Sequence, residues 1–376
     1  MPPPAASAVA DLLADLIAFR THHAPTGGAA GAGDELALCR HLAPLLAARG
    51  ADEVQVVETG RRAGGPGGYV YARWGRPRLL INSHLDTVPA NTGWTRDPWT
   101  AEITADRVYG LGAADTKGAI AAALTALERT TPRDVAVLFS GDEERGTAAV
   151  EHFLASPARA GLERAIVCEP TARTAGTRHR GVLSYRARVA GAGGHSSNAD
   201  HMPAPIVTMA RLAVALHGLG VEHRLAGPPD MQGLCMNVAT LDGGVAFNVV
   251  PDGATLGWSI RPWPGFDRAA WEARQAEAAR AAEDGAPIVI EPQVEHAPFG
   301  CDDAVLAGLV AGHARERVAL QFWTEAALYQ EAGIAAIVIG PGDIAQAHAP
   351  DEWVTRADLD WAVDLFTRVL EASRGS

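Results

Sequence analysis

Apolar side chains recur along the first half of the chain with two different spacings. In residues 8–19 and 35–48 they recur every three or four positions, which predicts amphipathic helices, although Pro44 is expected to bend the second one. Short continuous apolar runs follow, and these favour strands that are covered on both faces. Strands are predicted at residues 54–57, 69–74, 79–82, 135–139 and 165–168, and further helices at residues 116–127 and 147–154. This alternation predicts a three-layer α/β domain with a mostly parallel sheet.

The pattern changes near residue 178. Residues 182–189 alternate apolar and polar positions, as a half-buried strand does. Helices are then predicted at residues 205–219 and 266–283, and strands at residues 237–241, 254–260 and 287–294. The resulting β-α-β-β-α-β order is typical of a two-layer, ferredoxin-like unit.

The C-terminal part of the chain returns to the first pattern. Helices are predicted at residues 305–315, 325–332 and 359–372, and strands at residues 320–322 and 335–339. We therefore expect one α/β domain made of residues 1–178 and 295–376, interrupted by a smaller domain at residues 179–294.

Composition narrows the classes of function. The chain has 376 residues, a net charge of −12 and 48% hydrophobic residues, which fits a packed protein and argues against a nucleic-acid partner. No apolar run reaches the ~18 residues that span a bilayer, and Asp11 and Asp15 interrupt what would be a secretion signal. The four cysteines, Cys39, Cys168, Cys235 and Cys301, form no C-x-x-C pair. Reduced thiols and a cytoplasmic location, with no membrane partner, are therefore expected.

Histidine and carboxylate side chains follow several of the apolar runs directly. His84 and Asp86 come after the strand predicted at residues 79–82. Because residues two apart on an extended segment face the same way, His84 can bind a metal while Asp86 accepts the proton of the other ring nitrogen. The alternative is an exposed His-Asp pair at the end of a strand.

Three further acids occupy similar positions. Asp115 precedes the helix predicted at residues 116–127, where a carboxylate either bridges two cations or caps the helix. Glu143 and Glu144 follow the strand at residues 135–139. An acid run is commonly a solvated surface, but active sites of α/β proteins lie at this edge of the sheet. Since neighbouring side chains diverge, we assign Glu144 to a metal and Glu143 to a water molecule as general base.

Glu169 and His348 complete the candidate ligands. Glu169 ends the strand at residues 165–168, and His348 lies in the loop that follows residues 335–339. Imidazole and carboxylate donors without a thiolate suit zinc, and also cobalt or manganese. The sequence therefore predicts a metal-dependent hydrolase.

The motifs around these residues resemble one known family. They are residues 83–89 (SHLDTVP), 109–118 (YGLGAADTKG), 142–144 (DEE), 168–170 (CEP) and 193–197 (GGHSS). Together they are similar to the co-catalytic di-zinc aminoacylase and carboxypeptidase family, essentially from end to end. The resemblance implies two zinc ions bridged by Asp115, one completed by His84 and Glu169 and the other by Glu144 and His348. It also implies a homodimer formed through the inserted domain, with His195 reaching the active site of the neighbouring subunit and assisting catalysis there.

Three other segments are similar to particular members of that family. Residues 94–98 (WTRDP), 322–326 (FWTEA) and 340–348 resemble the members that deacetylate N-acetylornithine or N-acetylcitrulline. This implies removal of the acetyl group from an N-acetyl amino acid in arginine biosynthesis, with N-acetylornithine as the first candidate and N-acetylcitrulline as the alternative. Succinyl-diaminopimelate desuccinylase, a dipeptidase and an inactive metal-binding scaffold are the remaining alternatives. Every expected catalytic position is filled, which argues against the scaffold.

The residues that recognise substrate are less distinct in the sequence. A free α-carboxylate favours a bidentate arginine, and Arg261, at the end of a predicted strand, is the first candidate. Asn248 is expected to assist it, and the resemblance supports both residues. Arg180 is a weaker choice, and Glu325 is a candidate partner for a substrate ammonium group. A role at the surface or in domain packing is the alternative for each.

Overall fold

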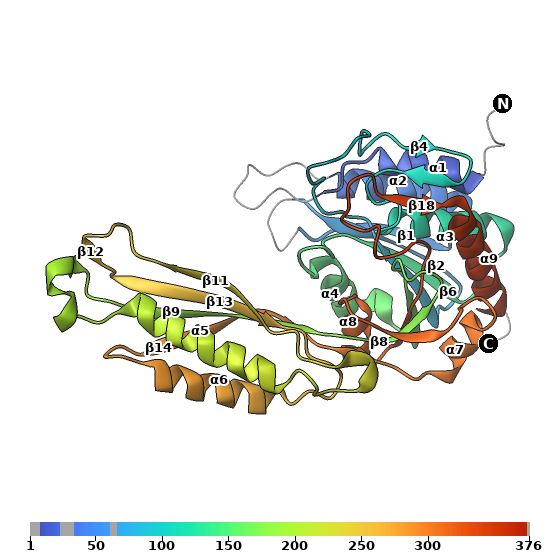
Figure 1. Ribbon diagram of the computed structural model, residues 1–376. Helices are drawn as coiled ribbons and strands as arrows, with labels where there is room; N and C mark the ends of the chain where they lie inside the picture. Colours follow the sequence, from blue (N-terminus) through green and yellow to red (C-terminus); the bar gives the residue numbers. More distant parts are fainter. Residues whose placement is uncertain (1–7, 23–33, 61–65, 374–376) are drawn as a thin grey trace. The chain divides into compact units, whose positions relative to one another are not determined.

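The computed structural model describes residues 8–22, 34–60 and 66–373 (Figure 1). The chain divides into two compact units. The first consists of Met1–Thr177, Cys301–Val318 and Thr324–Ser376, and the second of Arg178–Gly300 and Ala319–Trp323. Residues 178, 295–300 and 319–323, which the sequence assigned to the first unit, lie in the second by this division.

A mixed sheet forms the centre of the first unit. Seven of its strands run in the order β1(Glu53–Glu58), β2(Gly68–Trp74), β6(Val135–Ser140), β3(Leu79–His84), β7(Arg164–Val167), β17(Ala335–Val338) and β8(Ala175–His179), and the short strands β15(Phe299–Gly300) and β16(Arg317–Leu320) pair with β8. The central pairs β6–β3, β3–β7 and β7–β17 are parallel. Antiparallel pairs flank them at β1–β2, β2–β6 and β17–β8. The α/β class is confirmed, and the expected parallel arrangement occupies the centre of the sheet.

Helices cover both faces of this sheet. One large apolar core joins α1(Ala8–Ile17), α2(Glu35–Ala48), α3(Lys117–Arg129), α7(Ala304–Val310) and α9(Arg356–Ala372) with the sheet. The other layer contains α4(Ala148–Ala155) and α8(Ala326–Glu331), which contact each other as well as β2 and β7 respectively. The α2 helix is continuous through Pro44, so this proline does not divide it into two helices. The α7 helix ends at Val310 and not at residue 315.

The second unit is a four-stranded antiparallel sheet with two helices. Its strand order is β11(Asn237–Gly243), β13(Gly253–Ile260), β9(Val182–Ala190) and β14(Ile288–His296), and the helices are α5(Pro205–Glu222) and α6(Arg268–Ala282). Buried residues alternate along β13, and they pack with both helices in a separate core around Trp258 and Trp271. The order β-α-β-β-α-β is the one that the sequence predicts.

Short elements complete the described residues. They are β4(Glu102–Ile103), β5(Arg107–Tyr109), β18(Trp353–Thr355), β10(Gly194–His195), β12(Val249–Val250), β15(Phe299–Gly300), β16(Arg317–Leu320) and the single-turn helices η1(Pro157–Arg159), η2(Ser196–His201) and η3(Pro229–Met231). The strand predicted at residues 320–322 is observed earlier, as β16. Within the part of the chain that the structure describes, no helix combines the length and the apolar character needed to cross a membrane.

Candidate metal centre

Parallel pairing brings several candidate residues to one edge of the sheet. In the β3–β6 pair, His84 lies opposite Ser140, so the loop that carries Glu144 begins beside His84. In the β3–β7 pair, Asn82 lies opposite Val167, so Glu169 emerges just beyond the same edge. The carboxyl ends of parallel strands are where α/β proteins place their sites, and the register fulfils that rule here.

Two loops supply the remaining candidates. Asp115 lies in the turn before α3, and His348 lies in the loop after β17, which pairs in parallel with β7. The backbone of His348 is in the left-handed region, with φ at 58°, which is uncommon for a residue other than glycine. The side-chain amide of Asn91 donates to the carbonyl oxygen of His348 at 2.8 Å and helps to hold this conformation.

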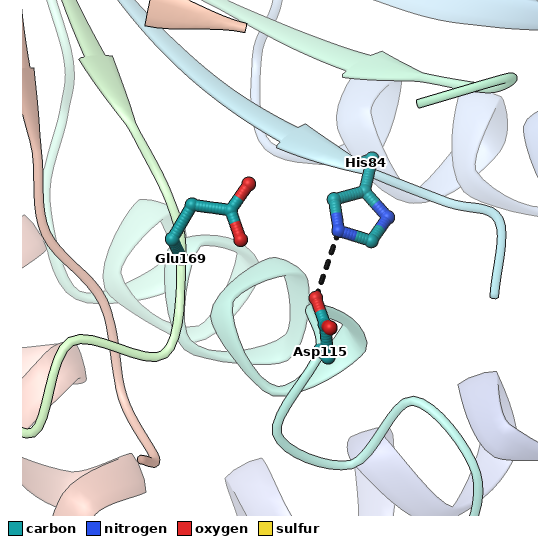
Figure 2. A group of neighbouring side chains, drawn as sticks. All are labelled: His84, Asp115 and Glu169. Atoms are coloured by element: carbon teal, nitrogen blue, oxygen red, sulfur yellow. Dashed lines mark hydrogen bonds and ion pairs between the residues drawn. The ribbon is translucent and has the colours of Figure 1, made fainter. Parts of the chain in front are cut away.

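His84, Asp115 and Glu169 form the first group of candidate ligands (Figure 2). The Nε2 atom of His84 lies 3.0 Å from Oδ1 of Asp115. The carboxylate of Glu169 faces the same space, and one donor atom from each residue lies within 4.8 Å of the other two. All three residues are buried, so a cation held among them would be shielded from solvent.

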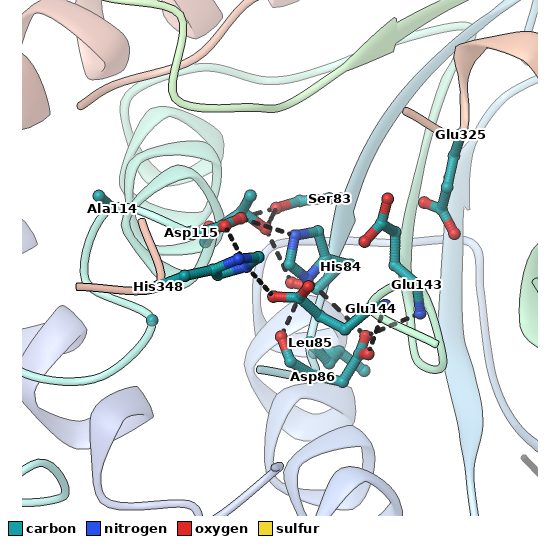
Figure 3. A network of polar contacts seen from close by, with 12 residues as sticks. Ser83, His84, Leu85, Asp86, Ala114, Asp115, Glu143, Glu144, Glu325 and His348 are labelled. Atoms are coloured by element: carbon teal, nitrogen blue, oxygen red, sulfur yellow. Dashed lines mark hydrogen bonds and ion pairs between the residues drawn. The ribbon is translucent and has the colours of Figure 1, made fainter. Parts of the chain in front are cut away.

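Asp115, Glu144 and His348 form the second group (Figure 3). The Nε2 atom of His348 lies 3.0 Å from Oε1 of Glu144 and 3.4 Å from Oδ2 of Asp115. The side chain of His348 is 52% exposed, whereas those of Asp115 and Glu144 are 8% exposed. This side of the cluster is therefore open to solvent. Asp115 belongs to both groups, and its two oxygens face different histidines, as a bridging ligand requires.

The electrostatics of the cluster fit bound cations. Burial alone would raise the pKa of Asp115. Hydrogen bonding to His348 and His84 outweighs burial and holds this pKa well below its usual range. The contacts with Asp115 and Glu144 raise the pKa of His348 to about 10. Burial also raises the pKa of Glu169 well above its ordinary value. The carboxylates lie close together and repel one another, and a bound cation would offset this repulsion. Carboxylate oxygens and imidazole nitrogens at such short separations suit divalent metals such as zinc.

Asp86 contacts His84 in a different way from the one predicted. The Nδ1 atom of His84 lies 2.9 Å from the backbone carbonyl oxygen of Asp86, whereas the Asp86 carboxylate is 3.7 Å away. That carboxylate accepts the backbone N–H groups of Glu143 at 3.1 Å and Glu144 at 3.0 Å. The carbonyl therefore fixes the tautomer of His84, and the carboxylate holds the turn that carries the two glutamates.

Glu143 and Glu325 lie beside the two ligand groups (Figure 3). Burial raises the pKa of Glu143 well above its ordinary value, and nearby carboxylates add to the effect. Glu325 is 1% exposed, and its Oε2 accepts the hydroxyl of Ser140 at 2.9 Å. Its burial raises the pKa of its carboxyl to about 7. A carboxyl that is shielded in this way is poorly placed to pair with a substrate ammonium group.

His195 and Asn248 are neighbours in the second unit. In the β10–β12 pair, His195 lies opposite Val249, and the backbone N–H of Ser196 donates to the carbonyl oxygen of Asn248 at 3.1 Å. Both side chains are exposed. The Nδ1 atom of His195 accepts the backbone N–H of Ser197 at 3.2 Å, which places the proton of the neutral ring on Nε2 and makes that nitrogen a donor.

Arg261 and Arg180, the two candidate arginines, have contrasting environments. Arg261 is exposed, and its guanidinium group makes no hydrogen bond or ion pair within the described residues. Arg180 is 2% exposed and donates to the side chain of Gln321 at 2.8 Å and to the carbonyl of Arg261 at 3.0 Å. It also donates to the carbonyls of Gly233 and Gln232, at 2.7 and 3.0 Å. This favours a structural role for Arg180 and leaves Arg261 available to a ligand.

Known proteins resemble most of the chain. Residues 80–372 match peptidase family M20/M25/M40. N-acetyl-L-citrulline deacetylase from Xanthomonas campestris pv. campestris is 36% identical over 323 residues, which cover 81% of this chain and 84% of that protein. The chain belongs to peptidase family M20/M25/M40. Acetylornithine deacetylase from Yersinia pestis is 30% identical to this M20 protein over 310 residues, 79% of each chain.

Solved structures support the same fold. An M20 family metallo-carboxypeptidase from Sulfolobus solfataricus superimposes with a TM-score of 0.75 at 18% identity, covering 97% of this chain and 99% of that one. A dinuclear metal-binding peptidase of the M20 family from Bacillus subtilis gives a TM-score of 0.67 at 16% identity, covering 98% of each chain. The family and the hydrolase class that the sequence predicted are thus confirmed for this M20 protein.

Proposed function

We propose that this M20 protein is a metal-dependent deacetylase of N-acetyl amino acids. The observation that carries the proposal is the pair of three-residue ligand groups that share Asp115, with Glu143 beside them. The deacetylase names of two relatives that align with most of the chain support the reaction class.

The ligand groups suggest how zinc ions would be held. His84 and Glu169 would bind one ion and Glu144 and His348 the other, with Asp115 between them. Two cations in such a site supply Lewis acidity and lower the pKa of a water molecule from ~15.7 toward ~7. Cobalt or manganese would suit the same donors.

Glu143 is the proposed general base. It lies at the ligand groups without being a member of either, and the bond from its backbone N–H to Asp86 fixes its position. Its carboxylate would take the proton of the attacking water and return it to the leaving amine nitrogen. The exposed Nε2–H of His195 would donate to the oxyanion of the tetrahedral intermediate.

We further propose that two copies assemble through the second unit. The β11 strand lies at the edge of its sheet, and an exposed edge is a template for pairing with another strand. Next to it, α5 exposes Val207, Val214 and Val221, at 48%, 74% and 42%, on one face. An apolar stripe beside an unpaired edge supports a two-fold contact in which β11 of one subunit pairs with β11 of the other.

N-acetylcitrulline is the preferred substrate in this proposal, with N-acetylornithine second. The sequence ranked the two in the opposite order. The 36% identity with N-acetyl-L-citrulline deacetylase supports the change. So does the burial of Glu325, which was the candidate partner for the ammonium group of ornithine. Exposed Arg261, assisted by Asn248, would bind the α-carboxylate that both substrates share.

The cysteines support a cytoplasmic location in this proposal, because they are free and form no disulfide within the described residues.

Steady-state kinetics on the zinc-loaded protein test the proposal. We expect hydrolysis of both N-acetyl amino acids, with kcat/KM for N-acetylcitrulline higher by about tenfold, or ~1.4 kcal/mol. A chelator should abolish turnover, and zinc should restore it. N-succinyl-diaminopimelate and a dipeptide are the comparison substrates, and faster cleavage of either would refute the proposed reaction.

A further inference from the structure

A buried carboxylate that the sequence did not single out holds the loop of Asp115. The Oε1 atom of Glu352 accepts the backbone N–H groups of Ala114 at 2.9 Å and Asp115 at 3.1 Å, and Oε2 accepts that of Gly112 at 3.0 Å. The backbone carbonyl of Glu352 accepts the N–H of Gly110 at 2.9 Å. Glu352 is 1% exposed. One residue therefore organises the whole turn that presents Asp115.

The same short segment, residues 348–352, also carries His348. Within it, Asp351 accepts the backbone N–H of Thr95 at 2.9 Å and its hydroxyl at 2.6 Å. Asn91 donates to the carbonyl of His348 at the other end of the segment. The segment is thus fixed to the rest of the first unit on both sides of its centre, and Glu352 links it directly to the Asp115 loop.

We propose that Glu352 is a positioning residue that fixes the bridging carboxylate of Asp115 relative to His348 and so sets the affinity of the two-metal centre. This inference rests on the proposed function, because it assumes that cations bind between those side chains. Both carboxylate oxygens of Glu352 accept from backbone donors, and among the described residues no other side chain accepts these three N–H groups. Residues that orient metal ligands in this way commonly change metal affinity by about 10–100-fold when they are replaced.

The geometry predicts different consequences for two substitutions. In Glu352→Gln the side chain keeps its size, but its NH2 group must face one of the three N–H groups, and two donors repel. In Glu352→Ala all three N–H groups lose their acceptor in a buried site, which costs stability as well. The glutamine variant is therefore the more direct probe of metal affinity.

Asp303 offers a matched control in the same unit. Its carboxylate accepts the backbone N–H of Leu306 at 2.8 Å, caps α7 and pairs with Arg164 at 3.1 Å. Replacing it in Asp303→Asn removes a carboxylate bonded to backbone, as in Glu352→Gln, but at a helix cap and not at a ligand loop. A loss of affinity that arises from general destabilisation would appear in both variants.

The experiment titrates metal-free wild type, Glu352→Gln and Asp303→Asn with Zn²⁺ by calorimetry and with Co²⁺ by visible absorption. We expect Glu352→Gln to bind cations about 10–100-fold more weakly, with an altered Co²⁺ spectrum, and Asp303→Asn to match the wild type. Thermal unfolding of each metal-free variant reports the change in stability separately.

The outcomes separate this inference from the proposed function. Two tight sites in the wild type, with unchanged affinity and spectrum in Glu352→Gln, would overturn the positioning role alone. Equal weakening in Glu352→Gln and Asp303→Asn would overturn it too, since general destabilisation would then explain both. A wild type that binds no cation would overturn the proposed function together with this inference.

Discussion

The residues proposed for metal chemistry and those proposed for substrate recognition are held in opposite ways. In the first unit, the side chains of His84 and Asp115 are 2% and 8% exposed and contact each other directly, and His348, at 52%, is the exposed exception among the candidate ligands. In the second unit, Arg261 and Asn248, which are proposed to bind substrate, are exposed, and so is His195. Substitution of a residue in a buried cluster disturbs the side chains packed against it and lowers stability. Substitution of an exposed residue has little effect on stability. Chemistry should therefore depend on the stability of the fold, while recognition should be separable from it.

The adjacent acids Glu143 and Glu144 give the largest expected effect and the first test of this contrast. Glu143→Gln removes the proposed general base, so we expect kcat to fall by about 10²–10⁴-fold. Metal content should remain at the wild-type level, because Glu143 belongs to neither ligand group. Steady-state kinetics and elemental analysis of the same preparation check both statements.

Glu144→Gln is the matched control for that variant. Glu144 contacts His348 at 3.0 Å as a member of the second ligand group, so this substitution should lower the metal content as well as kcat. Near-normal turnover in Glu143→Gln, or equal loss of metal in both variants, would disprove the division of roles between the two residues.

His195, the proposed oxyanion donor, tests whether a residue of the second unit takes part in catalysis on another subunit. Removing an oxyanion donor in His195→Ala should lower kcat by about 10²–10³-fold without changing metal content. If His195 acts on the neighbouring subunit, mixing His195→Ala with Glu143→Gln restores one complete site in each mixed dimer. Random exchange should then recover roughly a quarter of wild-type activity, as the statistics of a two-fold dimer require.

The control for this experiment is each inactive variant incubated with itself under the same exchange conditions. Recovery that appears only in the mixture supports action across subunits. If native mass spectrometry shows that mixed dimers have formed and activity stays absent, His195 acts within its own subunit or takes no part in catalysis.

The sequence singled out residues that the fold brings together as candidate metal ligands, because of where strands end. His84, Glu144 and Glu169 each follow a continuous apolar run, and parallel pairing in register places such residues at one edge. Local pattern was sufficient because the strands are buried on both faces. The antiparallel flanks of the sheet, at β1–β2 and β17–β8, were harder to predict because pairing direction depends on distant partners and leaves no local signal.

The supporting residues escaped sequence reasoning for a related reason. Glu352 follows Asp351 in a polar stretch that resembles any solvated loop, yet its carboxylate is buried against the backbone of residues 112–115. Asp86 was recognised, but its carboxylate accepts the backbone N–H of Glu143 at 3.1 Å and lies farther, 3.7 Å, from the His84 ring. A backbone N–H is present whatever side chain its residue carries. A hydrogen bond from a carboxylate to backbone N–H groups therefore leaves no motif at the donor residues. Only the sequence position of Glu352, shortly after the candidate ligand His348, gives a signal to look for.

Arg261 and Arg180 give the smallest expected effect on chemistry and the sharpest separation of recognition from stability. Arg261→Ala should raise KM for either N-acetyl amino acid by about 10–100-fold, which corresponds to the loss of a hydrogen bond to a charged group. Metal content and melting temperature should not change.

Arg180→Ala instead removes four buried hydrogen bonds within the second unit and should lower the free energy of unfolding by about 3 kcal/mol. Because Arg180 holds the carbonyl of Arg261, a moderate rise in KM should accompany that loss. A rise in KM in Arg180→Ala but not in Arg261→Ala would mean that the buried arginine binds substrate. Exposure would then not identify the substrate-binding arginine in this unit.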